Sequence, residues 1–196
     1  MVNTPTLETP RLRLRKFSKN DLEALLMIFS DFETNTYLPW FLISTLEEAR
    51  MILNTRYLET YMSQEGYNYA ICLKTDDIPI GYINVSTDEI QDLGYGLRKN
   101  FWHKGIVTEA GKVILEQIKK DGIPYITATH DIKNVRSGEV MKYLGMRYQY
   151  SYEELWKPKN ILVTFRMYQL NFDPQDTRVY RTYWNKYALH FIETDI

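Results

Sequence analysis

Residues 93–110 read Leu93-Gly-Tyr-Gly-Leu-Arg-Lys-Asn-Phe-Trp-His-Lys-Gly-Ile-Val-Thr-Glu-Ala110. This stretch predicts a strand over 93–98, a tight turn, and a helix from about Ile106 to Lys120. A helix N-terminus offers unpaired backbone N–H groups and the positive end of the helix dipole, which together bind anions. Gly105 lets the backbone approach an anion closely, Lys104 adds a positive charge, and Thr108 adds a hydroxyl. The stretch therefore predicts a site for a pyrophosphate group.

The glycine spacing of this stretch matches neither a P-loop nor a dinucleotide-binding fingerprint. Taken alone, Gly105 favours the other interpretation, an ordinary strand–helix turn that happens to contain a glycine. The choice between the two interpretations depends on the rest of the chain.

The segments on either side predict a mixed α/β fold. Residues 67–73 and 80–86 are strand-like and form an antiparallel hairpin across the turn at Thr75–Pro79. The order strand–helix–strand occurs twice toward the C-terminus, which implies parallel neighbours there. We expect one mixed sheet with helices on both faces. Its other strands are expected at 12–17, 125–129, 147–153 and 161–169, and its other helices at 21–30, 44–61 and 134–144.

Composition places the 196-residue chain among ordinary globular proteins with one main domain. The net charge of -1 argues against nucleic acid or an anionic membrane as the main partner. Cys72 is the only cysteine, so no intramolecular disulfide can form, and we expect it in the core. The histidines show no metal-ligand spacing, so no metal is expected. No leader and no membrane-spanning run is apparent, and we expect a cytoplasmic protein.

At residues 101–110 the sequence resembles the GNAT superfamily of acetyltransferases. Trp102-His-Lys-Gly-Ile-Val107 occupies the family's phosphate-binding signature Gln/Arg-x-x-Gly-x-Gly/Ala, and departs from it at both ends. The wording is closer to the branch related to N-terminal (alanine) acetylation of ribosomal proteins, Tyr-Trp-Gly-Lys-Gly-Tyr-Ala-Thr-Glu-Ala. Two further matches are Glu8–Arg15, similar to the first strand of that branch, and Asn134-Val-Arg-Ser137 before Tyr143-Leu-Gly-Met146, similar to its Asn-x-x-Ser helix. The resemblance covers about residues 8 to 170.

The resemblance implies a GNAT-type splayed sheet and acetyl-CoA as cosubstrate. The cofactor would lie where the strands at 93–98 and 125–129 separate, with its pantetheine arm pairing along the first of them. That implies backbone contacts from Leu97 and Arg98. The phosphate loop implied by the family consists of Trp102, His103, Lys104, Gly105, Ile106, Val107 and Thr108.

The helix at 134–144 is the second implied cofactor contact. Asn134, Ser137 and Met141 share one helical face by spacing. Asn134 either contacts the cofactor or caps the helix. Many family members have a Tyr at the position of Met141 that protonates the leaving thiolate, and Met cannot do so. Ser137 or water is the fallback donor, because Tyr143 lies roughly 200° further round the helix and should point away.

The acceptor side is less well defined by sequence. Tyr37, Trp40 and Phe41 either shape the acceptor pocket or simply pack their loop, and Tyr95 faces either the cleft or the core. We interpret His103 as a surface or phosphate contact, and Glu109 as a carboxylate that favours the helix dipole. The general base cannot be chosen, and the acidic loop residues that could border the acceptor are Asp31, Glu33, Asp88 and Glu89.

The last residues form a separate prediction. Tyr180, Trp184, Tyr187 and Phe191 fall on one helical face, so residues 177–193 are expected to form a helix docked on the domain or at a dimer contact. The predicted organisation is an acetyltransferase domain over 8–172 and a C-terminal extension over 173–196, in a monomer or homodimer. The function expected is transfer of an acetyl group from acetyl-CoA to an amine. The alternatives are a non-catalytic acyl-CoA-binding module and an interaction protein on the same fold.

Overall fold

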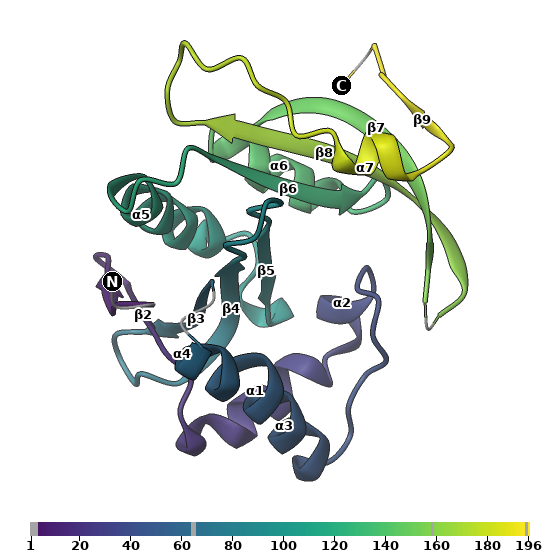
Figure 1. Cartoon of the computed structure of the whole chain (residues 1–196). Coiled ribbons are helices and arrows are strands. Elements are labelled where there is room, and N and C mark those ends of the chain that lie inside the picture. Colours follow the sequence, from purple (N-terminus) through teal and green to yellow (C-terminus); the bar gives the residue numbers. More distant parts are fainter. Residues whose placement is uncertain (1–3, 64–65, 158, 195) are drawn as a thin grey trace.

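The computed structural model describes residues 4–63, 66–157, 159–194 and 196, and it contains two antiparallel sheets that diverge from one edge (Figure 1). The first sheet has five strands in sequence order, β1-β2-β3-β4-β5. Their bounds are β1 (Leu7–Glu8), β2 (Leu12–Arg15), β3 (Tyr67–Leu73), β4 (Pro79–Val85) and β5 (Leu93–Leu97).

The second sheet has the order β6-β8-β7-β9, with β6 (Tyr125–Asp131), β7 (Arg147–Trp156), β8 (Ile161–Asn171) and β9 (His190–Phe191). A single parallel bridge, Asp92 to Thr127, joins it to the first sheet. There the Thr127 amide donates to the Gln91 carbonyl at 3.1 Å and the Thr127 hydroxyl donates to the Ile90 carbonyl at 2.7 Å. Beyond this junction β5 and β6 separate, as a splayed GNAT-type sheet requires.

Within the described part of the chain, the expected parallel neighbours occur only at that bridge. The second predicted pair, β6 and β7, is not adjacent, because β8 forms a hairpin with β7 and inserts between the two. The predicted strand–helix–strand order was correct, but it did not reveal that β8 would lie between β6 and β7 in the second sheet.

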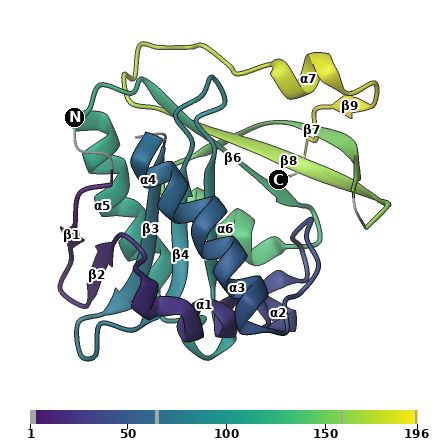
Figure 2. The same cartoon turned by 60° about the horizontal axis from the view of Figure 1, so that its bottom comes forward.

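Helices cover both faces of the first sheet because its inner strands are apolar on both sides. Ile71 and Ile83 face α5 (Ile106–Lys120), whereas Cys72 and Tyr82 face α1 (Leu22–Phe29), and these sets form two separate cores. In Figure 2 the helices α1, α3 and α4 lie in front of β3 and β4. The remaining helical elements are η1 (Lys19–Asp21), α2 (Phe32–Asn35), α3 (Leu46–Ile52), η2 (Leu53–Leu58), α4 (Glu59–Ser63), η3 (Lys99–Phe101), α6 (Val135–Tyr143) and α7 (Thr182–Lys186).

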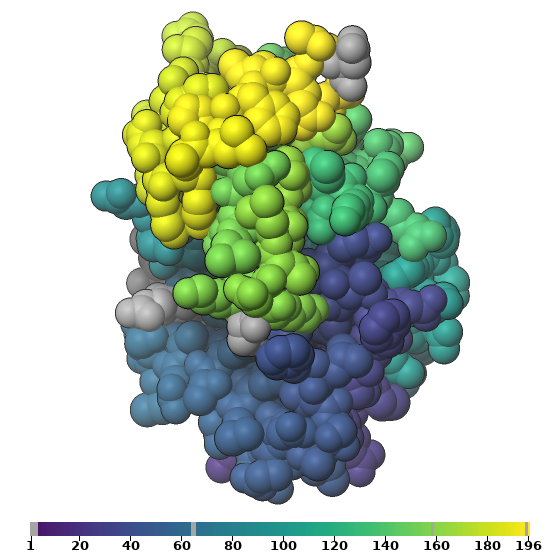
Figure 3. Space-filling view, turned by 90° about the vertical axis from the view of Figure 1, so that its right-hand side faces the viewer, coloured from purple at the N-terminus to yellow at the C-terminus, as the bar shows by residue number. Residues whose placement is uncertain are grey.

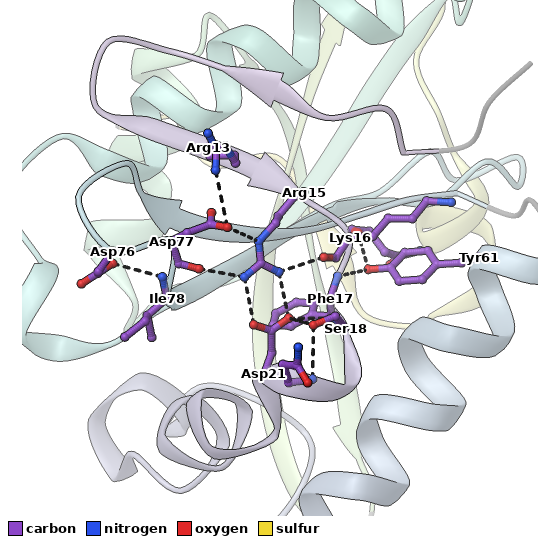
Figure 4. Close-up of polar contacts among 12 residues, drawn as sticks. Arg13, Arg15, Lys16, Phe17, Ser18, Asp21, Tyr61, Asp76, Asp77 and Ile78 are labelled. Atoms are coloured by element: carbon purple, nitrogen blue, oxygen red, sulfur yellow. Dashed lines mark hydrogen bonds and ion pairs between the residues drawn. The ribbon is translucent and has the colours of Figure 1, made fainter.

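A buried ion pair fixes the end of β2 to the start of the first helix (Figure 4). The Arg15 guanidinium donates to both carboxylate oxygens of Asp21, at 2.8 and 2.9 Å, and to the Asp77 carbonyl at 2.7 Å. Although burial raises it, hydrogen bonds from Arg15 and Ser18 hold the pKa of Asp21 below its usual value. Removing Arg15 would leave a buried unpaired carboxylate, so this pair keeps the frame of the first sheet rigid.

The C-terminal segment, residues 173–196, differs from its prediction. The expected helix over 177–193 is wrong in extent, because the helix described there spans Thr182–Lys186, and a bend at 188–189 then leads into β9. β9 then pairs with β7, with Phe191 opposite Ser151 and His190 opposite Tyr152. The reason is that β7 would otherwise present unpaired backbone groups, and an extended segment satisfies them where a helix cannot.

Side chains of the C-terminal segment lie on both faces of β7. On one face Tyr152 stacks with Tyr183 and Tyr187, each at 4.9 Å between ring centroids. On the other face Glu193 pairs with Arg166 and Ser151. Figure 3 shows the C-terminal segment, in yellow, covering the end of the molecule where the second sheet lies. The division into a domain and an extension, and any dimer contact, remain predictions.

Two kinds of feature are absent from the residues that the structure describes. No helix in this part of the chain is long and apolar enough to cross a membrane. Among the same residues there is no group of three or more His, Cys, Asp or Glu that could hold a metal ion.

Candidate functional site

A cavity of about 610 Å³ lies where β5 and β6 separate, bounded by α2, β5, the N-terminus of α5, and α6. Most residues predicted for cofactor binding line it, although they come from three separate stretches of chain. Those in its wall are Leu97, Trp102, His103, Lys104, Gly105, Ile106, Val107, Thr108, Asn134 and Ser137. Two residues predicted for the acceptor side, Tyr37 and Tyr95, line the same cavity.

The phosphate loop has the backbone of an anion site. His103 and Gly105 both adopt left-handed conformations, with φ of 58° and 68°. Alternation of left-handed and right-handed residues turns successive N–H groups toward one point, and such concavities bind anions. Gly105 is the N-cap of α5 and supplies no capping side chain, so the first-turn amides are left for a ligand. A Cβ at Gly105 would meet only the Arg11 guanidinium, at 3.8 Å, so backbone conformation and not crowding favours glycine.

Arg11 braces this loop from the first sheet, and the sequence did not reveal it. Its guanidinium donates to the Lys104 carbonyl at 2.9 Å and to the Glu109 carboxylate at 2.7 Å. Thr9 also donates to Glu109. Although burial raises it, these hydrogen bonds hold the pKa of Glu109 below its usual value. Glu109 thus has a structural partner, in agreement with the interpretation made from sequence, while Arg11 lies too far along the chain for a local signal.

The free edge of β5 offers different backbone groups from those expected. The Arg98 amide donates to the Ile80 carbonyl on β4 at 3.0 Å, so it is unavailable to a cofactor. Because an antiparallel ladder alternates, the N–H and C=O of Tyr95 and Leu97 point the other way, toward the cavity. The Leu97 carbonyl already accepts from Thr34 at 3.0 Å and from the Trp102 indole at 2.6 Å. The groups left at this edge are both backbone groups of Tyr95 and the Leu97 amide.

The face of α6 that meets the cavity was predicted only in part, because Ser137 lies on it and Met141 does not. Met141, placed on that face by spacing, is 1% exposed and belongs to the core below α5. Ser137 lines the cavity as its spacing predicted, together with Arg136, Val140 and Tyr143. Tyr143 was expected to point away, yet it is 70% exposed at the cavity wall. The core sets the rotation of the helix, because the apolar Met141 and its neighbour Leu144 must be buried.

Asn134 caps α6 and also lies in the wall of the cavity, where its contact with a cofactor stays a prediction. Its side chain accepts from the Ser137 amide at 3.4 Å as the N-cap of α6, and it lines the cavity. The amide nitrogen of Asn134 is not used in the cap, so the side chain can act as a donor toward the cavity.

Tyr95 joins the two sides of the cleft. Its phenol lies 2.9 Å from the Ser137 hydroxyl and donates to the Ser137 carbonyl, also at 2.9 Å. Tyr95 lines the cavity and also packs against the core, so both placements considered from sequence apply. Burial raises the pKa of Tyr95 well above its usual value, which keeps the phenol protonated.

The acceptor residues predicted from sequence do not lie together. Tyr37 lines the cavity, beside Glu33, Thr34 and Leu38 of the same segment. Trp40 instead packs under the Arg56 guanidinium, 4.0 Å from its ring centroid, and donates to Asn35. Phe41 is 64% exposed, and neither it nor Trp40 forms part of the cavity wall. For Trp40 the packing interpretation is therefore the correct one.

Asp92 is a candidate that the sequence did not single out. It lies at the junction of the two sheets, opposite Thr127. Its Oδ1 is buried and has no hydrogen-bond partner among the described residues, and the same holds for the adjacent Gln91 Oε1. Burial, with a smaller effect from Asp88, raises the pKa of Asp92 to about 7. Gln91 is in a left-handed conformation with φ of 52°, and strain of this kind often accompanies functional sites.

Comparison with known proteins agrees with this geometry. The family model for the acetyltransferase (GNAT) domain matches residues 11–147. An uncharacterised N-acetyltransferase of Bacillus subtilis, YnaD, is 28% identical over 145 residues, covering 72% of this chain and 82% of its own. A GNAT acetyltransferase structure from Bacillus anthracis is 24% identical with a TM-score of 0.74, covering 85% of this chain and 98% of its own.

A third match is a structure of RimL, a ribosomal L7/L12 α-N-protein acetyltransferase, in complex with coenzyme A. It has a TM-score of 0.73 at 15% identity and covers 85% of this chain and 98% of its own, which shows a shared fold. The family match spans well over half of the chain, and strands β2 to β6 and the glycine loop lie within the matched residues. This chain therefore belongs to the GNAT acetyltransferase family.

Proposed function

We propose that this protein transfers the acetyl group of acetyl-CoA to a primary amine by direct attack in a ternary complex. The observation that carries the proposal is the combination of an anion-binding backbone loop and a free strand edge in one cavity. A pyrophosphate requires the first, and an extended amide-bearing arm requires the second.

The residues present fit both parts of the cosubstrate. The amides of residues 103–108 would hold the phosphates, with Lys104 and Arg136 at the same cavity wall supplying positive charge. The backbone of Tyr95 and the Leu97 amide would pair with the pantetheine arm, and Asn134 adds a side-chain amide. The family resemblance implied backbone contacts from Leu97 and Arg98. The proposal keeps the Leu97 amide and puts Tyr95 in place of Arg98, whose amide is bonded to Ile80.

The chemistry asks for a base near the junction of the sheets. The amine lone pair attacks the thioester carbonyl, the C–S bond breaks, and its electron pair passes to sulfur. We assign proton removal from the amine to Asp92, because its buried Oδ1 has no hydrogen-bond partner among the described residues and its pKa is raised to about 7. The Ser137 hydroxyl is assigned to the departing sulfur, since Met141 is buried and cannot donate.

Two measurements test this function. Calorimetry with CoA tests binding, and a screen of amines with acetyl-CoA, read by released thiol, tests turnover. The expected result is binding together with thiol release that depends on the amine. Binding without turnover for every amine would instead favour the alternative, a non-catalytic acyl-CoA-binding module.

The role of Asp92 has its own test. Asp92→Asn should lower kcat by about 10²–10³-fold, the scale of general-base effects. In the wild type kcat should rise with pH through about 7, because Asp92 acts as a base only after losing its proton. The matched control is Asp88→Asn, which keeps a side-chain oxygen for the loop amides but removes the like charge. Asp88→Asn should lower the pH midpoint of the kcat profile and leave its high-pH plateau unchanged. A midpoint that is unshifted in both variants would exclude Asp92 as the base.

The acceptor is assigned only to the class of primary amines, which includes protein N-termini and small molecules. The fold shared with RimL supports a protein α-amino group as one member of that class. Peptides with a free or a blocked N-terminus, compared in the thiol-release assay, distinguish it from a small-molecule amine.

A further inference from the structure

We propose that Tyr95 is a positioning residue for acetyl transfer, which acts through Ser137 by orienting the serine hydroxyl toward the departing sulfur. The proposal rests on the proposed function and adds a second hydroxyl, from β5, to the donor on α6. It concerns a residue that the family pattern, with its Tyr at the position of Met141, does not point to.

The hydrogen bonds around Tyr95 allow only a few arrangements. A carbonyl oxygen can only accept, so the contact between the phenol and the Ser137 carbonyl uses the single phenolic proton. The second contact, at 2.9 Å between the two hydroxyl oxygens, is then filled by the Ser137 proton. In this arrangement the Ser137 proton is directed at Tyr95, while the serine oxygen keeps a lone pair free.

Negative charge on the departing sulfur would reverse the direction of the hydrogen bond between the two hydroxyls. When the Ser137 hydroxyl turns toward the anion, the phenol can turn from the carbonyl to the serine oxygen, since both acceptors lie at 2.9 Å. The result is a chain of two hydroxyls, from Tyr95 to Ser137 to sulfur, in which each bond strengthens the next. Without the phenol the serine oxygen would lose the group that donates a hydrogen bond to it. The serine hydroxyl would then be a weaker and less oriented donor to sulfur.

The chain stabilises the thiolate by hydrogen bonding and does not deliver a proton from Tyr95. Burial holds the phenol in its protonated form, so full transfer to a thiolate would be uphill. The amine proton passes to Asp92, and the electron pair of the C–S bond stays on sulfur. The thiolate takes its proton from solvent after release. The expected effect is therefore modest.

A double-mutant cycle tests the order of action. Tyr95→Phe keeps the ring and its packing, and Ser137→Ala keeps the carbonyl that Tyr95 binds. Each should lower kcat about 10-fold with the KM for acetyl-CoA changed less than about 3-fold. If Tyr95 acts through Ser137, the double variant should be no slower than Ser137→Ala alone. Losses that multiply in the double variant, or an unchanged kcat in Tyr95→Phe, would overturn the proposal.

Tyr150→Phe is the matched control for loss of a buried phenol. Tyr150 also donates to a backbone carbonyl, that of Tyr180 at 2.8 Å, but in the aromatic cluster away from the cavity. It should lower the melting temperature and leave kcat unchanged. A fall in kcat similar to that of Tyr95→Phe would mean that the effect is structural.

A second readout needs no turnover. The pKa of the thiol of bound CoA can be followed by its rate of alkylation against pH, and the only cysteine of the chain, Cys72, is 0% exposed. Tyr95→Phe and Ser137→Ala should both raise that pKa, because each removes stabilisation of the thiolate. An unchanged thiol pKa with CoA still bound would refute the role of Tyr95. Absence of turnover in the wild type, with this shift present, would instead refute the proposed function alone.

Discussion

The phosphate loop at residues 102–108 and the C-terminal segment at residues 173–196 are built in opposite ways. The loop leaves the first-turn amides of α5 without a capping side chain, and contacts such as Arg11 with the Lys104 carbonyl and the Trp102 indole with the Leu97 carbonyl hold it in place. The C-terminal segment works through side chains, with a stacked aromatic cluster on one face of β7 and an ion pair on the other.

The difference separates function from stability. Backbone amides aimed at a ligand contribute little until the ligand binds, whereas buried aromatic surface contributes to folding at once. We therefore expect changes in the loop to remove cofactor binding at small cost in stability, and changes in the segment to do the reverse.

Truncation after Asp173 gives the largest expected effect. It uncovers Tyr150, Tyr152 and Phe165, which the segment covers, and leaves β7 without its partner β9. At about 1.5–3 kcal/mol for each large apolar side chain returned to water, the free energy of unfolding should fall by several kcal/mol. The measurement is thermal unfolding together with sedimentation, and removal of residues 195–196 alone is the control. An unchanged melting curve and sedimentation coefficient would show that the segment stabilises nothing.

Gly105→Glu probes the loop and comes second. A side chain at φ of 68° is strained, and the added carboxylate repels phosphate, so CoA affinity should fall by at least about 100-fold, or roughly 3 kcal/mol. Gly122→Glu is the matched control, since Gly122 follows the other end of α5 with φ of 83° and open space around it. The control should bind CoA normally by calorimetry. Equal losses in both variants would mean that helix strain, and not the anion site, is responsible.

The same contrast explains which parts of the fold and of the site could be predicted from the sequence. The loop, β5 and the start of α5 are encoded by neighbouring residues, and these predictions agree with the structure. Arg11 and Asp92 became candidates only through contacts with residues distant in sequence. The rotation of α6 was set by burial of Met141, and the extent of the last helix by the open edge of β7. Both are tertiary effects that helical spacing does not contain.

Glu193→Gln sharpens the comparison on the side of the C-terminal segment. The hydrogen bond from Arg166 lowers the pKa of Glu193, so the ion pair stabilises the fold above the ordinary carboxyl range and is lost as the pH falls through the folded pKa. The variant should lose about 0.5–1 kcal/mol at pH 7. Denaturant titrations at pH 7 and pH 3 test this. A difference from the wild type that is the same at both pH values would exclude the ion pair as its cause.

Tyr143→Phe gives the smallest expected effect. Tyr143 lines the cavity but is 70% exposed, so loss of its hydroxyl should change turnover less than about 2-fold. Steady-state kinetics with acetyl-CoA measures it. A loss above about 100-fold, the scale of an acid–base effect, would show that Tyr143 and not the pair of Tyr95 and Ser137 serves the thiolate.

The separation of β5 from β6 has a consequence for how the protein is handled. The backbone groups of Tyr95 and the amide of Leu97 form a strand edge inside the molecule, reachable through the open cavity. Unpaired strand edges are templates for association with other chains, and proteins usually cover them. In the proposed function the cosubstrate covers this edge, and it is released in every catalytic cycle. Saturating CoA should therefore slow aggregation in concentrated samples as well as raise the melting temperature, through the ordinary linkage of binding to folding.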